Sequence, residues 1–199
     1  MLNLNEFAKE VHAVAVEHGW WESQKTNDIE TIIALIHAEW SEALEEYRAN
    51  RPMVWFECMT TKAPCDADSE RCSCWHDGEC NAGDRGSKPE GIAIELTDGV
   101  IRILDLMAHM DTPFEEGNYI ELAPRTLPQL VTMLHYATAI AGGEFALYGM
   151  SDEAAGWLCS CITIVREWLK EQGEDLGELL RMKHEYNKTR SYRHGGKRC

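Results

Sequence analysis

Two pairs of acidic residues in this sequence have the side-chain type and the spacing of a metal site. Glu39 and Glu42 are three residues apart, as are Glu95 and Asp98, so the members of each pair lie side by side if their segments are helical. Oxygen ligands suit Mg²⁺, and carboxylates gathered in one place repel one another unless a cation lies between them. We therefore expect these four side chains to hold Mg²⁺, with Mn²⁺ as the alternative ion.

A further acid, Glu46, lies one helical turn beyond Glu42. At about 100° per residue, Glu46 falls on the same edge of the helix as Glu39 and Glu42, whereas Glu45 falls on the solvent side. A single ExxE pattern is common, and its simplest interpretation is a charged face in water. The ExxD pattern downstream favours a site over that interpretation.

The elements that must position these acids are helices. Apolar residues recur with a helical period and no segment has a clear strand pattern, which predicts an all-α bundle of about five to six helices. We expect a single domain over 1–199, in which 111–172 holds an additional helical pair. Asn5 is the expected cap of the first helix, and Gly142-Gly143 the end of the fourth. The predicted helices span 5–18, 28–48, 90–109, 127–141, 151–172 and 174–188.

The predicted helix over 90–109 is apolar around most of its circumference, which is typical of the central helix of a bundle. Its polar residues form one strip along the helix, and a polar strip on an otherwise buried helix favours a crevice over an open surface. The strip consists of Glu95, Asp98, Arg102 and Asp105.

Residues 53–90 differ in composition from the rest and form a long loop inserted between the two acidic helices. The loop is rich in potential metal ligands, namely Cys58, Cys65, Cys72, Cys74, Cys80 and His76. Their spacing is not that of paired CxxC motifs, so Zn²⁺ bound by this Cys-rich loop stands beside two alternatives. The loop is either a reduced, flexible connection or a lid over the site.

The net charge of −15 argues against a nucleic-acid polymer as the partner. Residues 181–199 nevertheless contain seven Lys and Arg residues against one Glu, so this tail would close over an anion or onto the acidic body. No leader and no apolar run long enough to cross a bilayer are recognised, which predicts a cytoplasmic protein with no membrane partner. Trp20 and Trp21 either plug an end of the bundle or form a wall on which a base stacks.

At 34–48 and 95–105 the chain resembles the MazG-like all-α nucleotide pyrophosphohydrolases, which carry an ExxE on one helix and an ExxD on the next. The run from 183 to 197 also resembles the terminal segment of that family, in which a Lys, an Asn and an Arg approach the nucleotide. Two departures are a longer loop between the acidic helices and the insertion of 111–172. The second makes the chain look more like relatives built from two tandem halves, such as the dimeric dUTPases.

The resemblance implies a Mg²⁺-dependent hydrolase that converts a nucleoside triphosphate to the monophosphate and pyrophosphate. It implies a homo-oligomer, either a dimer or a tetramer, and the acidic pairs as metal ligands. Glu46 or Glu42 would orient or deprotonate the attacking water. The substrate would contact Lys183, Asn187, Arg190 and Trp21. The rival hypothesis is a non-catalytic helical module, stabilised by zinc in the Cys-rich loop, that binds a nucleotide or a protein.

Overall fold

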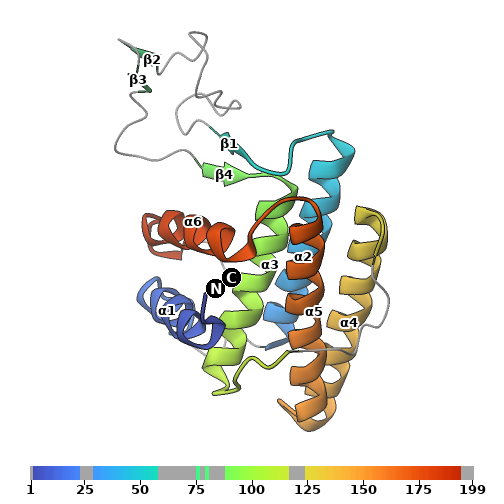
Figure 1. Cartoon of the computed structure of the whole chain (residues 1–199). Helices are drawn as coiled ribbons and strands as arrows, with labels where there is room; N and C mark the ends of the chain where they lie inside the picture. The colour runs from blue at the N-terminus through green and yellow to red at the C-terminus, as the bar shows by residue number, and fades with distance from the viewer. Residues whose placement is uncertain are drawn as a thin grey trace.

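The computed structural model describes residues 2–22, 29–57, 88–116 and 124–193, together with the backbone of 75–76 and 79–80. Over these ranges the chain is mostly helical, which confirms the all-α prediction (Figure 1). The helices are α1 (Leu4–Glu17), α2 (Ile29–Arg48), α3 (Ile92–His109), α4 (Leu127–Tyr148), α5 (Asp152–Glu171) and α6 (Leu176–Lys188). The short strands are β1 (Trp55–Glu57), β2 (Trp75–His76), β3 (Glu79–Cys80) and β4 (Lys88–Glu90).

A two-stranded ribbon, not predicted from the sequence, turns the chain between the two acidic helices. β1 follows α2 and pairs antiparallel with β4, with Trp55 opposite Glu90 and Glu57 opposite Lys88. β4 leads almost directly into α3. The carboxyl end of α2 therefore meets the amino end of α3, and the two helices run antiparallel. β2 and β3 form a separate pair, in which Trp75 lies opposite Cys80.

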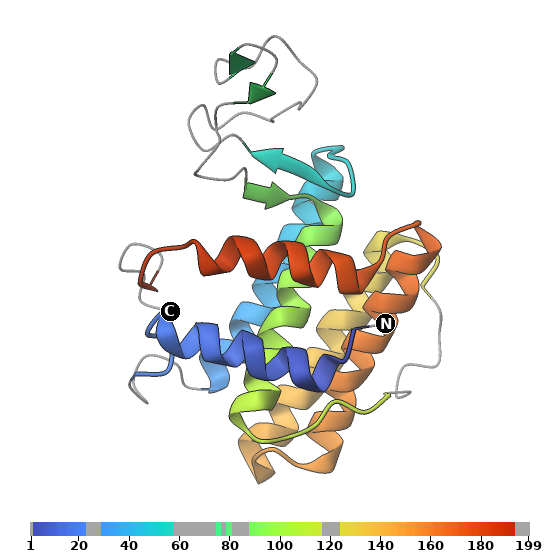
Figure 2. The ribbon, with the colours of Figure 1, turned by 60° about the vertical axis from the view of Figure 1, so that its left-hand side comes forward.

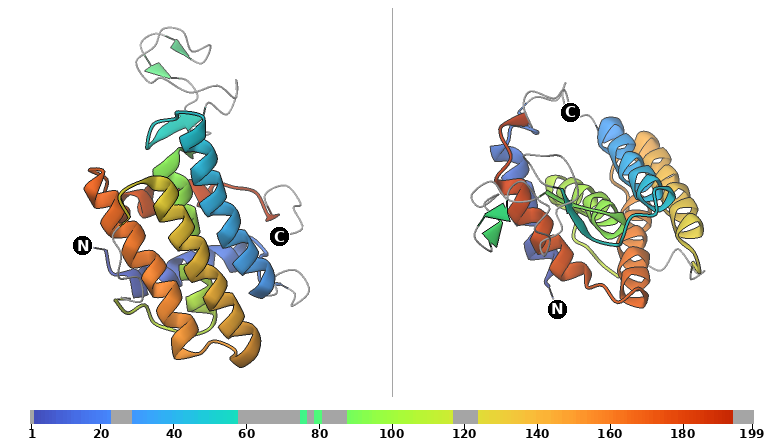
Figure 3. Two further views of the ribbon diagram at one scale, coloured as in Figure 1. Left: turned by 90° about the vertical axis from the view of Figure 1, so that its right-hand side faces the viewer. Right: turned by 90° about the horizontal axis from the view of Figure 1, so that it is seen from above.

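Helix α3 is the centre of the fold, as its apolar circumference predicts. It packs against α1, α2, α5 and α6, and most of its side chains are buried. α1 and α6 lie across one side of α3 (Figure 2). Seen from above, α2, α4 and α5 lie on the other side (Figure 3). The polar strip of α3 thus has α1, α2 and α6 around it.

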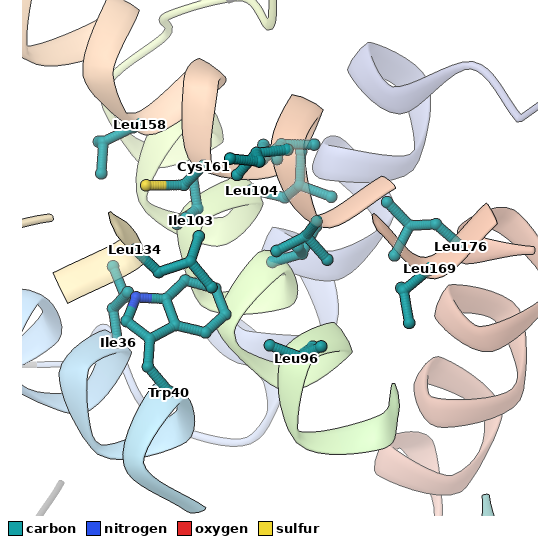
Figure 4. Packing of buried hydrophobic residues seen from close by; sticks show 14 of the residues in the cluster. Ile36, Trp40, Leu96, Ile103, Leu104, Leu134, Leu158, Cys161, Leu169 and Leu176 are labelled. Atoms are coloured by element: carbon teal, nitrogen blue, oxygen red, sulfur yellow. The ribbon is translucent and has the colours of Figure 1, made fainter. Parts of the chain in front are cut away.

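A close contact between Trp40 and Gly99 sets the spacing of α2 and α3. Trp40 is fully buried, and its indole Nε1 donates a hydrogen bond to Thr138 Oγ1 of α4 at 3.0 Å. A Cβ atom at Gly99 would lie 2.2 Å from the Trp40 ring, so only glycine fits there. The indole lies among buried side chains of α2, α3 and α4, including Ile36, Ile103 and Leu134 (Figure 4).

Two predicted helix boundaries are wrong. α4 does not end at Gly142-Gly143 but continues to Tyr148, and Gly149 ends it with a φ of 76°. Gly142 instead serves packing, because a Cβ atom there would lie 3.0 Å from Ile33 Cγ2 of α2. The cap of α1 is Asn3, whose side chain accepts from the backbone N–H groups of Asn5 and Glu6. Asn5 itself hydrogen-bonds across to the backbone of Phe114.

Helix α4 is long and apolar enough, by length and composition alone, to match a membrane-spanning segment, which corrects the statement that no such run exists. Its buried residues pack against α2 and α5. The side chains of the candidate zinc ligands in the Cys-rich loop lie outside the described residues, and so does the zinc prediction made for them. The same holds for the segment from 194 to 199.

Candidate metal centre and adjoining cavity

Three of the four predicted ligands meet between α2 and α3. Because these helices are antiparallel and Trp40 lies against Gly99, residues just before and after Trp40 face the first turns of α3. Oxygen atoms of Glu39, Glu42 and Glu95 lie within 4.8 Å of one another. The side chains of Glu39 and Glu95 are buried, whereas Glu42 is exposed. This arrangement is open to solvent on one side and can hold one hard divalent cation.

The fourth predicted ligand, Asp98, faces a buried lysine. Lys183 of α6 places Nζ 2.8 Å from Asp98 Oδ2 and 3.4 Å from the backbone oxygen of Pro89. The Lys183 residue is only 1% exposed. Such a lysine is unusual unless it is paired, so its position is fixed by the acidic strip of α3. Helix α6, close to the carboxyl end of the chain, is thereby joined to the metal centre.

Glu39 is paired with Arg102, whose Nε lies 2.5 Å from Glu39 Oε1. Two cations therefore accompany four carboxylates in this part of the structure. Burial, and after it the neighbouring charge of Asp98, raises the pKa of the Glu95 carboxyl to about 9. Burial also raises the pKa of Glu39, against the opposing effect of Arg102. The centre thus has more negative charge than its own cations balance, and it takes up protons when no other cation is present.

A cavity of about 320 Å³ adjoins the carboxylates. Its walls come from α1, α2, α3 and α6, and they change in character along α3. Near the carboxylates the walls are charged, with Lys88, Arg102, Lys183 and Arg190 as the cations. Farther along α3 they become apolar and aromatic, and the lining residues there include Val14, Trp20, Ile32, Leu35 and Ile101. A cavity of this composition suits an anionic ligand with a flat apolar part.

The predicted phosphate-contacting residues at the carboxyl end of the chain all line this cavity. Lys183 and Asn187 are one turn apart on one side of α6, and Arg190 follows the end of that helix. The Asn187 Oδ1 atom is buried and has no hydrogen-bond partner among the described residues, and the same is true of His184 Nε2. Buried polar atoms normally have partners, so these two atoms have unused capacity to bind a ligand in the cavity.

Two predicted site residues are not in the cavity wall. Glu46 is turned to the ribbon, where its Oε2 accepts a hydrogen bond from Trp55 Nε1 at 2.7 Å. Trp21 stacks on His109, with ring centroids 3.7 Å apart, and donates to Asp105. Its neighbour Trp20 lines the cavity instead. The turn after Gly19 determines which of the two tryptophans faces the cavity. Helical periodicity in the sequence does not predict this, because it does not extend through a turn.

Sequence reasoning assigned no role to three residues that the structure brings to the site. Arg102 and Asp105 were visible in the polar strip of α3, and the available signal was that Asp98, Arg102 and Asp105 follow one another at intervals of four and three residues. Lys88 gave no signal, because it reaches the cavity from the ribbon. Comparison of the chain with protein-family models, curated proteins and solved structures finds no match.

Proposed function

We propose that this chain is a Mg²⁺-dependent nucleoside triphosphate pyrophosphohydrolase, which forms a nucleoside monophosphate and pyrophosphate. The observation that carries the proposal is the cluster of Glu39, Glu42 and Glu95 beside a cavity with charged and aromatic walls. Mg²⁺ draws the anionic part of the substrate toward an acidic protein, which carboxylates alone would repel. The aromatic part of the cavity accommodates the nucleoside.

The donor set supports a hard cation. All the candidate ligands are carboxylates, and the cluster contains no sulfur or imidazole. Burial and the charge of Asp98 raise the pKa of Glu95, and a bound cation would favour the ionised form of that carboxyl. Mg²⁺ would be held by Glu39, Glu42 and Glu95, with Asp98 adjacent. When bound, it supplies charge neutralisation at the phosphates and lowers the pKa of water.

Separate roles in the proposed reaction are assigned to the side chains around the cluster. Glu42 is the exposed member of the cluster and is assigned to accept the proton of the attacking water, in preference to Glu46, which is held by Trp55. Arg190 and Lys183 balance negative charge on the phosphates, and the unpartnered Oδ1 of Asn187 accepts a hydrogen bond from a water beside them. An Asn amide presents a donor and an acceptor, so it can meet either a phosphate oxygen or a water.

Substitution of Glu42 tests the proposal. Triphosphates are incubated with the full chain and Mg²⁺, and pyrophosphate release is measured. Glu42→Gln should lower kcat by about 10²–10⁴-fold, because the amide neither accepts the proton nor neutralises the cation. The matched control is Glu45→Gln on the same helix, since the Glu45 side chain is 65% exposed and pairs with Arg48. Equal activity of the two variants would contradict the assignment.

A further inference from the structure

The end of the cavity that lies away from the metal centre contains one half-buried carboxylate, that of Asp105, with no role in the proposed reaction. Asp105 lines the cavity two turns of α3 beyond Asp98, which is about 10 Å at 1.5 Å per residue. That distance is comparable to the distance between the α-phosphate of a nucleotide and the far edge of its base. Asp105 is therefore placed to contact the base when the phosphates lie beside Glu95 and Asp98.

The surroundings of Asp105 fit a flat apolar group better than a sugar. Since α2 and α3 are antiparallel, Ile32 and Leu35 of α2 lie opposite this end of α3. Trp20 and Val14 complete the wall, and all four line the cavity. Sugar hydroxyls need several polar partners, whereas an aromatic base packs against aliphatic and aromatic side chains and needs polar contacts only at its edge.

The Asp105 carboxylate is held rigidly by two side chains. Its Oδ1 lies 2.7 Å from His12 Nδ1, and the Trp21 indole Nε1 donates to Oδ1 at 3.1 Å and to Oδ2 at 3.2 Å. Trp21 is itself fixed by stacking on His109. Oδ1 therefore has both lone pairs engaged, while Oδ2 keeps one lone pair. This is one acceptor at a fixed position.

Asp105 Oδ2 remains a hydrogen-bond acceptor whether the proton of the His12–Asp105 hydrogen bond is carried by His12 Nδ1 or by Asp105 Oδ1. Burial raises the pKa of Asp105 and the hydrogen bond with His12 opposes the rise, and that hydrogen bond holds one proton. That proton lies between His12 Nδ1 and Asp105 Oδ1, because these atoms are 2.7 Å apart. The indole can only donate. Oδ2 is the oxygen that remains available to a ligand, and the ligand must therefore present a hydrogen-bond donor to it.

We propose that Asp105 reads the base, and that the site selects bases with an exocyclic amino group at the edge remote from the sugar. This inference rests on the proposed function and names the substrate class within it. A cytosine or an adenine presents an N–H donor to Oδ2. A uracil or a hypoxanthine presents a carbonyl oxygen at the same position, where two acceptors repel. Trp21 and His12 are positioning residues that act through Asp105.

The members of two matched pairs of nucleotides differ only in the exchange of the amino group for a carbonyl and in the proton that this exchange adds to the adjacent ring nitrogen. The first pair is dCMP and dUMP, and the second is dAMP and dIMP, each titrated calorimetrically into the full chain with Mg²⁺. We expect the amino member of at least one pair to bind roughly 10- to 100-fold more tightly, the effect of a hydrogen bond to a charged group. A larger ratio in the first pair identifies a pyrimidine site, and a larger ratio in the second a purine site. Equal or inverted ratios in both pairs would overturn the inference.

The variant Asp105→Leu should remove the discrimination, since leucine has a similar size and no acceptor. Asp152→Asn, at the exposed first turn of α5, is the control and should keep the ratio. If Asp105→Leu does not fold, as judged by circular dichroism, Asp105→Ala takes its place. An Asp105 variant that retains the preference for the amino-bearing base, or that alters only the ratio of dCMP to CMP binding, would show that Asp105 does not read the base.

The outcome is independent of turnover. Monophosphate binding can fail to discriminate while triphosphates are still hydrolysed, in which case the base assignment is wrong and the proposed function stands. Loss of all Mg²⁺-dependent hydrolysis with discrimination intact would instead contradict the proposed function and leave a nucleotide-binding site.

Discussion

Lys183 Nζ lies 2.8 Å from Asp98 Oδ2, in a salt bridge between the last helix and the central one. The lysine is almost fully buried, and its stem crosses from α6 to the ribbon that joins α2 and α3. Positive charge at this point offsets part of the repulsion among the carboxylates. The same contact brings Asn187 to the cavity, because it lies one turn after Lys183 on one side of α6, and Arg190 follows just after the helix ends.

Removing the charge of Lys183 should destabilise the protein. In Lys183→Met, Asp98 stays partly buried without its partner, and breaking a buried pair in this way costs about 3–5 kcal/mol of unfolding free energy. Lys188→Met is the control on the same helix, since Lys188 forms an exposed pair with Glu185 that is worth less than about 1 kcal/mol. Urea unfolding measures the unfolding free energy of both variants. Equal losses would show that the Lys183–Asp98 pair contributes no more to stability than the exposed pair.

Mg²⁺ binding should release a proton at pH 7. The pKa of Glu95 is about 9 without a cation, against 4.5 for an ordinary glutamate, so the carboxyl is protonated at neutral pH and must ionise to bind the ion. Mg²⁺ affinity should therefore rise with pH up to about 9. Calorimetry in buffers with different ionisation enthalpies measures the proton released, and Glu95→Gln should abolish it. Binding with no proton release would contradict the electrostatic description.

The same pKa determines how stability depends on pH. A carboxyl whose pKa is raised in the folded state stabilises the fold fully below pH 4.5, and this contribution is lost as the pH rises toward 9. In EDTA, the unfolding free energy should therefore fall over that interval. Saturating Mg²⁺ should reduce the fall, because the ion supplies the missing charge. A flat profile in EDTA would show that Glu95 is ionised without the cation.

Gly99 should tolerate no side chain. Gly99→Ala places a methyl group against the Trp40 ring, and overpacking of this kind costs about 1–3 kcal/mol. Because the change pushes α2 away from α3, Mg²⁺ affinity should fall as well. Gly143→Ala is the matched control: no atom lies within 4 Å of the added carbon, so helix propensity predicts a gain of up to about 1 kcal/mol. Thermal unfolding with and without Mg²⁺ measures the stability and the Mg²⁺-dependent stabilisation of the Gly99→Ala and Gly143→Ala variants.

Glu46 should be dispensable for turnover. Its carboxylate is bound by Trp55 and is turned away from the cavity, so Glu46→Gln should keep kcat within a fewfold of the wild type while Glu42→Gln loses activity. Steady-state rates of the two variants at saturating Mg²⁺ make the comparison. A loss in Glu46→Gln as large as in Glu42→Gln would return the role of general base to Glu46.

Helices and acidic pairs were predictable from the sequence because both depend on short-range periodicity. Glu39, Glu42 and Glu95 meet because i and i+3 positions share a helix face and the two helices pack antiparallel. The misses depend on contacts between distant segments. Trp55 binds Glu46 from the ribbon, and Gly142 contacts Ile33 across two helices instead of ending one. Neither contact leaves a local pattern in the sequence.

The most direct test of the central claim is the identity of the products. ³¹P NMR of the full chain with dCTP and Mg²⁺ should show dCMP and pyrophosphate in equal amounts, and EDTA should stop their formation. The claim is that the carboxylates of α2 and α3 direct hydrolysis to the α–β bond. Formation of dCDP and inorganic phosphate, or the absence of Mg²⁺-dependent products from dCTP, dATP, dUTP and dGTP alike, would contradict it.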